Sequence, residues 1–344
     1  MINQHTSRAV YVQTNDAAVN EVLAFARDAD GALTPLVAVA TGGRGTGMPH
    51  LASQSSIALA GDGRHLIVVN AGSDDVSLFT IGPDGPRLAD RVASDGVAPT
   101  SVSIAGSLVY VLNNGSASIS GFKIDSDRLV PLEGSRRVLS SVDADPAQIA
   151  FSPDGRVLAV TERGTDSIST FTLDQSGIAQ GPVTIPSSGA TPYGFDFTAG
   201  GAMIVTEAFG GASGRAAASS YSISQSGLMT VSGSVGDTRS EVCWAAVTRD
   251  GRFVYVTNFG DGTISSYAIG ADGSLELREA VAASTNLGEK GVRDEAITGD
   301  GRFLYALDAD ARRIYGWSVG EDGSLAPVGD TDGLPETVAG LAAS

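Results

Sequence analysis

Several residue types that commonly build functional sites are scarce in this chain of 344 residues. It contains one cysteine, Cys243, and three histidines, His5, His50 and His65. One cysteine permits no disulfide within the chain and excludes a zinc site built from cysteines. Because histidines are so few, nucleophilic triads and metal motifs have little support, and we expect no metal cofactor.

Positive charge is also scarce, since the chain has two lysines and a formal net charge of −17. Phosphate groups are bound by clustered Lys and Arg, so we expect neither a nucleic-acid partner nor an anionic membrane. No stretch approaches the roughly 18 apolar residues that span a bilayer. The start, "MINQHTSRAVYV", lacks the pattern of a signal peptide. We therefore expect a cytoplasmic monomer, or an exported one if a leader has been removed.

What the sequence does contain is a sevenfold repeat. Runs typical of buried strands recur as "AVYVQTN", "HLIVVN", "LVYVLN", "VLAVTE", "AMIVTE", "FVYVTN" and "FLYALD". A second run follows each of them and carries one aromatic residue in constant register, at intervals of 43 to 54 residues. These aromatic residues are Phe25, Phe79, Phe122, Phe171, Tyr221, Tyr267 and Trp317. Asp-Gly hairpin turns follow most of the second runs, and no segment has convincing helical periodicity.

Seven such units predict an all-β fold, a seven-bladed β-propeller with four-stranded blades around a central channel. A short apolar run before most units, such as "QIAFS" or "EAITG", would be the innermost strand. Blade 1 lacks such a run, and the C-terminal "LPETVAGLAAS" would supply it and close the ring. We expect one domain, residues 1–344. Blade 1 would cover about 8–48 plus a closing strand at 335–344, and the others about 54–95, 99–142, 146–188, 192–237, 241–286 and 292–333.

The glycine-rich stretch "TGGRGTGMPH", residues 41–50, resembles a loop that binds phosphate. A P-loop, however, requires Lys and then Ser or Thr after its last glycine, followed by a helix. Met48 and Pro49 occupy those places, and a strand follows. We therefore interpret the stretch as a flexible lip at the channel mouth, with Arg44 and His50 available to bind a ligand.

The blade segments "GRHLIVVNAGSDDVSLFTI" and "GRFVYVTNFGDGTISSYAIGADGSL" resemble the lactonase-type seven-bladed propellers. That family includes the propeller form of 6-phosphogluconolactonase and the fungal carboxymuconate-cyclising enzymes, and the likeness covers roughly residues 8–344. It implies a channel-mouth site for a small anionic lactone or lactone-forming acid. Glu207 is similar to the family's glutamate in blade 5, and Arg293 to its arginine in the last inner strand.

Two of the family's site residues are absent from this chain. Ala147 and Gln148 stand where the family carries a histidine, and Phe259 replaces an arginine. These differences remove an acid–base partner and one anion-binding group from the pattern that the resemblance implies.

A ring of polar positions closes the second strand of each blade. Its members are Thr14, Asn70, Asn113, Glu162, Glu207, Asn258 and Asp308. Short polar side chains at such places bind the backbone of the following loop, which is a purely structural role. Glutamates are longer and cap loops less well, so Glu162 and Glu207 are the members that we expect to face a ligand.

Three further segments carry candidate binding residues. The long loop "EAFGGASGRAAAS" of blade 5 contains Arg215, or is a tolerated surface insertion. The inner run "VRDEAI" of blade 7 places Arg293, Asp294 and Glu295 near the axis, where they would pair with each other or with a ligand. Blade 6 begins with Arg239, Glu241, Cys243 and Trp244, of which Trp244 would be a stacking floor or part of the core, and Cys243 an inert buried thiol.

The leading hypothesis is a lactonase-like or lactone-forming enzyme. Glu207 would be the general base, and Arg293, with Arg239 or Arg215, would bind the anionic group and stabilise the oxyanion. Glu162 and Arg163 would complete the rim. Ca²⁺ bound by oxygen atoms in the channel is an alternative to a site without cofactors. Two other functions stay open: a non-catalytic propeller that binds a ligand or protein on its rim, and an isomerase or cyclase of a natural-product pathway.

Overall fold

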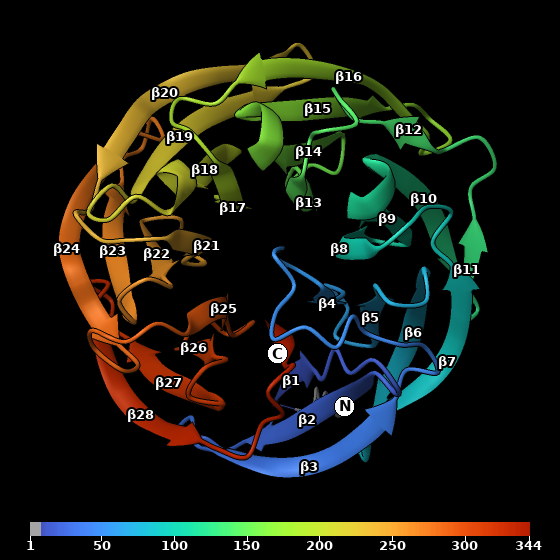
Figure 1. Cartoon of the computed structure of the whole chain (residues 1–344), viewed down its shortest axis with the longest axis horizontal. Coiled ribbons are helices and arrows are strands. Elements are labelled where there is room, and N and C mark those ends of the chain that lie inside the picture. Colours follow the sequence, from blue (N-terminus) through green and yellow to red (C-terminus); the bar gives the residue numbers. More distant parts are fainter. Residues whose placement is uncertain (1–7) are drawn as a thin grey trace, which may run out of the picture.

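Seven antiparallel sheets stand around a central axis in the computed structural model of the chain, which describes residues 8–344 (Figure 1). Each sheet is one blade, and its strands run in sequence order from the axis to the rim in six of the seven blades. The predicted seven-bladed β-propeller is therefore confirmed. Within residues 8–344, no helix has the length and apolar character to cross a membrane.

Blades 1 to 3 occupy the blue and cyan part of Figure 1. Blade 1 contains β29 (Ala339–Ala343), β1 (Ala9–Gln13), β2 (Glu21–Arg27) and β3 (Leu33–Ala40). Blade 2 contains β4 (Ile57–Leu59), β5 (His65–Asn70), β6 (Asp75–Gly82) and β7 (Gly85–Ala93). Blade 3 contains β8 (Pro99–Ala105), β9 (Leu108–Asn113) and β10 (Ser118–Asp125), and its outer strand is split into β11 (Arg128–Pro131) and β12 (Arg137–Val138).

Blades 4 to 7 complete the ring. Blade 4 contains β13 (Pro146–Phe151), β14 (Val157–Glu162), β15 (Ser167–Leu173) and β16 (Ala179–Pro186). Blade 5 contains β17 (Pro192–Phe197), β18 (Ala202–Glu207), β19 (Ala217–Ser224) and β20 (Gly227–Gly236). Blade 6 contains β21 (Val242–Val247), β22 (Phe253–Asn258), β23 (Thr263–Ile269) and β24 (Leu275–Ser284). Blade 7 contains β25 (Val292–Ile297), β26 (Phe303–Asp308), β27 (Arg313–Val319) and β28 (Leu325–Thr331).

The repeated aromatic residues lie on the third strand of every blade, and all seven are buried. They pack between neighbouring sheets, as Phe79 does against Val68 of its own blade and Tyr11 of blade 1. Burial of these large side chains, together with the aliphatic residues of the same clusters, stabilises the contact between neighbouring blades. The constant register seen in the sequence therefore reflects contacts between blades.

The ring closes through the C-terminal strand. β29 pairs antiparallel with β1, with Val10 opposite Ala343 and Val12 opposite Leu341. Blade 1 thus takes its innermost strand from the far end of the chain, as predicted from the sequence. The pairing covers the inner edge of β1, which would otherwise be free to pair with another chain.

The polar residues that end the second strands connect the second and third strands within a blade. Asn70, Asn113, Glu162 and Asn258 each bind a serine on the next strand, seven positions further along the chain. Glu207 binds Ser219, which is twelve positions further along because the loop of blade 5 is longer. The sequence left open whether these residues have a structural role or face a ligand. Their contacts support the structural role.

Inner strands are joined to the following blade by hydrogen bonds from side chains to main chain. Gln148 donates to the carbonyl of Phe195 at 2.9 Å and accepts from its N–H at 2.6 Å. The carboxylates of two aspartates accept N–H bonds in the same way, Asp196 from Val247 and Asp294 from Gly340. Gln148, which stands in place of the family's histidine, is therefore a clamp between blades 4 and 5.

The glycine-rich stretch between β3 and β4 is held in place by hydrogen bonds to blade 1. Its backbone bonds to blade 1 through Asn15, whose carboxamide pairs with Thr46 and donates to the carbonyl of Met48 at 3.0 Å. At Gly45 a Cβ would lie 2.1 Å from the carbonyl of Asn15, so only glycine fits there. The prediction of a flexible lip is wrong, because the stretch is bonded to blade 1, and close approach or positive φ accounts for its glycines.

Beyond that anchor the chain reaches into the middle of the ring (Figure 1). Leu51 is buried against blades 2 and 3, and Ser53 donates to the carbonyl of Thr100 at 2.6 Å. Gln54 crosses to blade 6, where it binds both main-chain groups of Ala245. We call residues 48–56 the channel strap, because this segment joins blades on opposite sides of the axis.

Candidate functional site

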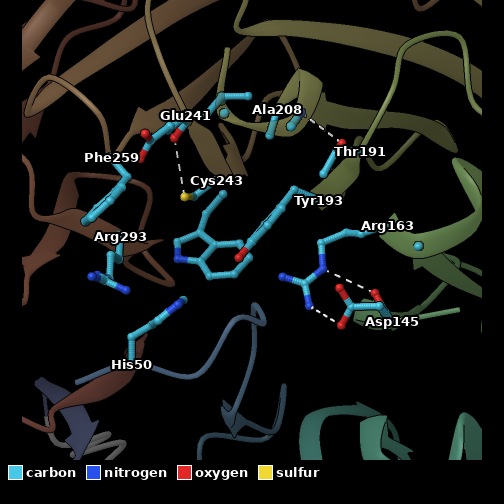
Figure 2. A pocket seen from close by; sticks show the side chains of 15 residues that line it. His50, Asp145, Arg163, Thr191, Tyr193, Ala208, Glu241, Cys243, Phe259 and Arg293 are labelled. Carbon is cyan, nitrogen blue, oxygen red and sulfur yellow. Dashed lines mark hydrogen bonds and ion pairs between the residues drawn. The ribbon is translucent and has the colours of Figure 1, made fainter. Parts of the chain in front are cut away.

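A cavity of about 520 Å³ opens where the loops of blades 4 to 7 meet the channel strap. Figure 2 shows its side chains converging from the inner strands and from two short loops. The loops contribute the 3₁₀ turns η2 (Arg163–Thr165) and η3 (Phe209–Gly211), and the strap contributes His50. The candidate site is therefore at the channel mouth.

The backbone at the start of the inner strands aims these side chains. A residue with positive φ precedes β13, β17 and β21, namely Asp145, Thr191 and Glu241. Two positions later the ladder register shifts in β17, β21 and β25, which leaves Tyr193, Cys243 and Arg293 outside regular pairing. Such irregularities redirect side chains, and here they turn all six toward one cavity.

Arg163 forms one wall of the cavity. Its guanidinium binds the carboxylate of Asp145 at 2.7 Å and lies 4.7 Å from the ring centre of Tyr193. Because the side chain is only 10% exposed and held from two sides, it presents a fixed charge to the cavity.

Arg293 forms the opposite wall (Figure 2). Its guanidinium stacks 4.3 Å from the ring centre of Phe259, and its one acidic partner among the described residues, Asp310, lies 3.5 Å away and is about half exposed. The Nε of Arg293 is buried and makes no hydrogen bond within residues 8–344. This cation therefore keeps hydrogen-bonding capacity for an anionic ligand.

Between the two arginines lies an aromatic floor. The rings of Tyr193 and Trp244 are 4.9 Å apart, and the indole Nε1 of Trp244 is a buried donor without a partner in the described part of the chain. Trp244 was predicted as either a stacking floor or part of the core, and it lines the cavity while being only 1% exposed.

The ionisable groups of the floor are neutral at pH 7. Burial raises the pKa of the Cys243 thiol to about 12 and raises the pKa of Tyr193 above its usual range. Cys243 was expected to be an inert buried thiol; its side chain lines the cavity and the residue is partly exposed, and the raised pKa keeps the thiol protonated. The two carboxylates of the cavity are engaged, Asp145 by Arg163 and Glu241 by Lys290 at 2.7 Å.

His50 enters the cavity from the channel strap. Burial, together with the positive charges of Arg293 and Arg163, lowers the pKa of His50 to about 4. The imidazole is therefore neutral at pH 7, and its buried Nδ1 has no hydrogen-bond partner in the described residues. Within residues 8–344 it is the one histidine at this site, since His65 binds Asp62 and Asp127 in blades 2 and 3.

The prediction that Glu162 and Glu207 face a ligand is wrong. Both are 0% exposed and line no part of the cavity. Glu207 accepts hydrogen bonds from the Gly189 N–H at 2.7 Å and the Ser219 hydroxyl at 2.6 Å, and also from the Ser234 hydroxyl. Each glutamate also binds the connection that arrives from the preceding blade, Glu162 at Ser140 and Glu207 at Gly189.

Four other predicted binding residues also lie outside the cavity. Arg44 and Arg215 are exposed, and Arg215 stacks on Phe209 at the outer side of its loop. Arg239 faces Asp261 at 4.0 Å. Asp294 points away from Arg293 toward blade 1, so the three charges of "VRDEAI" do not form one cluster.

The structure adds residues that the sequence reasoning missed, above all Tyr193, Thr191 and Asp145. A signal for them existed: they occupy the same two positions, relative to the start of the inner strand, as the predicted Glu241 and Arg293. Within residues 8–344, no group of three or more His, Cys, Asp or Glu side chains is arranged to bind a metal ion.

The chain matches the family "Lactonase, 7-bladed beta-propeller" over residues 5–136, 135–208 and 205–337, and it belongs to that family. Among curated sequences it is 26% identical over 143 residues to an uncharacterized protein of Staphylococcus epidermidis and 25% identical to one of Staphylococcus saprophyticus. The first match covers 40% of this chain and 42% of the relative, so the chain spans about two fifths of that relative's length.

Solved structures share the whole fold at low identity. A Bacteroides uniformis protein, described provisionally as a 6-phosphogluconolactonase, is 19% identical with a TM-score of 0.77, covering 97% of this chain and 99% of that one. The periplasmic gluconolactonase of Pseudomonas aeruginosa is 20% identical with a TM-score of 0.73, and 98% of each chain is covered. At these identities the likeness shows the fold.

Proposed function

We propose that the cavity binds a small lactone with an anionic substituent and opens its ring by hydrolysis, or forms the ring in the reverse direction. The observation that carries the proposal is the pair of guanidiniums, Arg163 and Arg293, on opposite sides of one cavity. Arginine binds carboxylates and phosphates through two parallel hydrogen bonds, and a second cation stabilises the oxyanion that forms when water attacks the carbonyl.

The floor supports a flat substrate in preference to a polyhydroxylated one. Tyr193, Trp244 and Phe259 offer aromatic surface, whereas Thr191 is the one aliphatic hydroxyl among the lining side chains. Sugar hydroxyl groups that face the aromatic rings and not the charged walls would lack partners, at a cost of about 1–3 kcal/mol each. An unsaturated carboxylated lactone would fit with fewer unpaired groups.

The test is lactone opening followed by proton release and corrected for spontaneous hydrolysis. The panel would contain 6-phosphogluconolactone, glucono-δ-lactone and muconolactone, with the third expected to have the highest kcat/KM. Arg293→Gln should lower kcat/KM about 10- to 100-fold, the effect of losing one hydrogen-bonded charge. Arg313→Gln, in the same blade but on its exposed side, is the matched control and should stay within twofold. Failure of all three lactones to open faster than in buffer would contradict the proposal.

A further inference from the structure

Both carboxylates that line the cavity are ion-paired. Asp145 is bound by Arg163, and Glu241 is bound by Lys290. Glu207, the base that the family resemblance implies, is sealed among serine hydroxyl groups. The lining residue that carries neither a charge nor an ion pair and has a basic nitrogen is His50.

We propose that His50 of the channel strap is the proton acceptor for hydrolysis in this cavity, and that an anion bound between Arg293 and Arg163 increases its basicity. Figure 2 shows the His50 side chain directed into the space between the two guanidiniums. The inference rests on the proposed function for the reaction itself, but the coupling between anion and imidazole is testable without it.

The channel strap holds the imidazole in place on both sides. Asn15 binds the carbonyl of Met48 two residues before it, and Leu51 is buried directly after it. Gln54 then fixes the segment to Ala245 in the inner strand of blade 6. A base held this firmly needs little reorganisation before it acts.

The groups that face His50 determine its proton affinity. They are Arg293 and Arg163, which are cationic, Cys243 and Tyr193, which are neutral, and Asp145 and Glu241, which are ion-paired. Burial together with the two guanidiniums keeps the imidazole unprotonated. An anion that neutralises the guanidiniums removes the electrostatic part of this effect, so the pKa of His50 rises toward the range in which a general base works best.

The step balances without a further reactant. His50 takes one proton from a water molecule while the water oxygen bonds to the lactone carbonyl carbon, and the resulting oxyanion lies beside a guanidinium. When the tetrahedral intermediate collapses, the bond from that carbon to the ring oxygen breaks. The imidazolium returns its proton to the ring oxygen, which yields the hydroxy acid and neutral His50.

The first experiment is an NMR titration of the histidine Cε1–H signals, in which the signal lost in His50→Gln identifies His50. In the free protein its midpoint should lie near pH 4, and saturating benzoate, a planar carboxylate that cannot be hydrolysed, should raise it by one unit or more. His65, which is bound by Asp62 and Asp127, should not respond to benzoate. An unshifted His50 signal in the presence of bound benzoate would overturn the coupling.

The second experiment is kinetic, on the best lactone of the panel. His50→Gln should lower kcat at least 100-fold with KM changed less than threefold, whereas His65→Gln, the control, should change neither. The acid limb of the wild-type kcat profile should lie at higher pH than that of kcat/KM, because bound substrate raises the pKa of His50. An unchanged kcat in a folded His50→Gln variant would overturn the role as acceptor. If no lactone is opened, the proposed function fails, and the benzoate titration still decides whether the anion and imidazole are coupled.

Discussion

Gln54 and Ala245 are 191 positions apart in the chain, yet the carboxamide of Gln54 donates to the carbonyl of Ala245 at 2.8 Å and accepts its N–H at 3.2 Å. This pair ties the strap that carries His50 to the strand that carries Cys243 and Trp244. Gly194 permits the crossing, because a Cβ there would lie 2.3 Å from the Gln54 Oε1 atom.

Gln54→Ala should therefore impair the site more than the fold. Removing two partly buried hydrogen bonds should lower the free energy of unfolding by about 1–3 kcal/mol and reduce kcat/KM by at least tenfold, as His50 loses its fixed position. Gln148→Ala removes an equivalent pair of bonds to Phe195 without touching the strap. It should cost similar stability in urea unfolding and leave kcat/KM within threefold. Equal losses of activity in the two variants would argue against a special role for the strap.

Glu207→Gln separates a structural from a catalytic glutamate. The amide group would turn a donor toward the hydroxyl and N–H donors that now bind the carboxylate, so the free energy of unfolding should fall by about 1–3 kcal/mol. Turnover per folded molecule should stay within threefold of wild type. A loss of kcat greater than 100-fold in a folded protein would restore Glu207 as a general base.

Glu295 should make the protein less stable as the pH rises. Its two carboxylate oxygens are buried without hydrogen-bond partners in the described residues, and burial, with the nearby Asp196 and Asp294 carboxylates, raises its pKa well above the ordinary value. The folded state thus keeps a proton that the unfolded state releases above about pH 4.5, so this group's contribution falls as pH rises toward its folded pKa.

Glu295→Gln removes the loss of stability that the buried carboxyl group causes as the pH rises. The variant should exceed wild type in free energy of unfolding by about 1–3 kcal/mol at pH 8 and by less at pH 5, measured by urea unfolding at both values. Glu321→Gln, at an exposed turn, should change neither value. A destabilised Glu295→Gln at pH 8 would mean that the carboxylate has a partner in solution.

Cys243 should react slowly in the folded protein. Burial raises the pKa of its thiol to about 12, so the thiolate fraction at pH 8 is on the order of 10⁻⁴. Iodoacetamide should label the native protein at least 100 times more slowly than the urea-unfolded chain, as followed by intact mass. Comparable labelling rates would show that the thiol is ionised or that its cavity opens readily.

The repeat was enough to predict the fold because each blade buries one aromatic residue against its neighbour. The regular spacing of these aromatic residues is visible in a single sequence. The closing strand was predictable for the same reason, since blade 1 lacked a partner for Val10 that Ala343 supplies. Of the residues that the sequence suggested for a site, Arg163, Arg293, Glu241, Trp244 and His50 line the cavity.

The remaining errors concern the direction of side chains. Glu207 ends its strand at a polar position that looks accessible in the sequence, but the serines that enclose it come from three different strands or loops. Tyr193 was missed because only a local shift of register turns it toward the cavity. A local shift of register leaves little trace in the types of residue in the sequence. The periodic spacing of buried residues, in contrast, is visible there.

The pairing of β29 with β1 has a consequence for biosynthesis. β29 follows every other described strand in the chain, so blade 1 lacks its inner strand for as long as residues 339–343 have not been made. During that time the edge of β1 is open, and two nascent chains close together on one message could pair through it. Synthesis of residues 339–343 therefore both completes the ring and ends the period in which the edge of β1 is open.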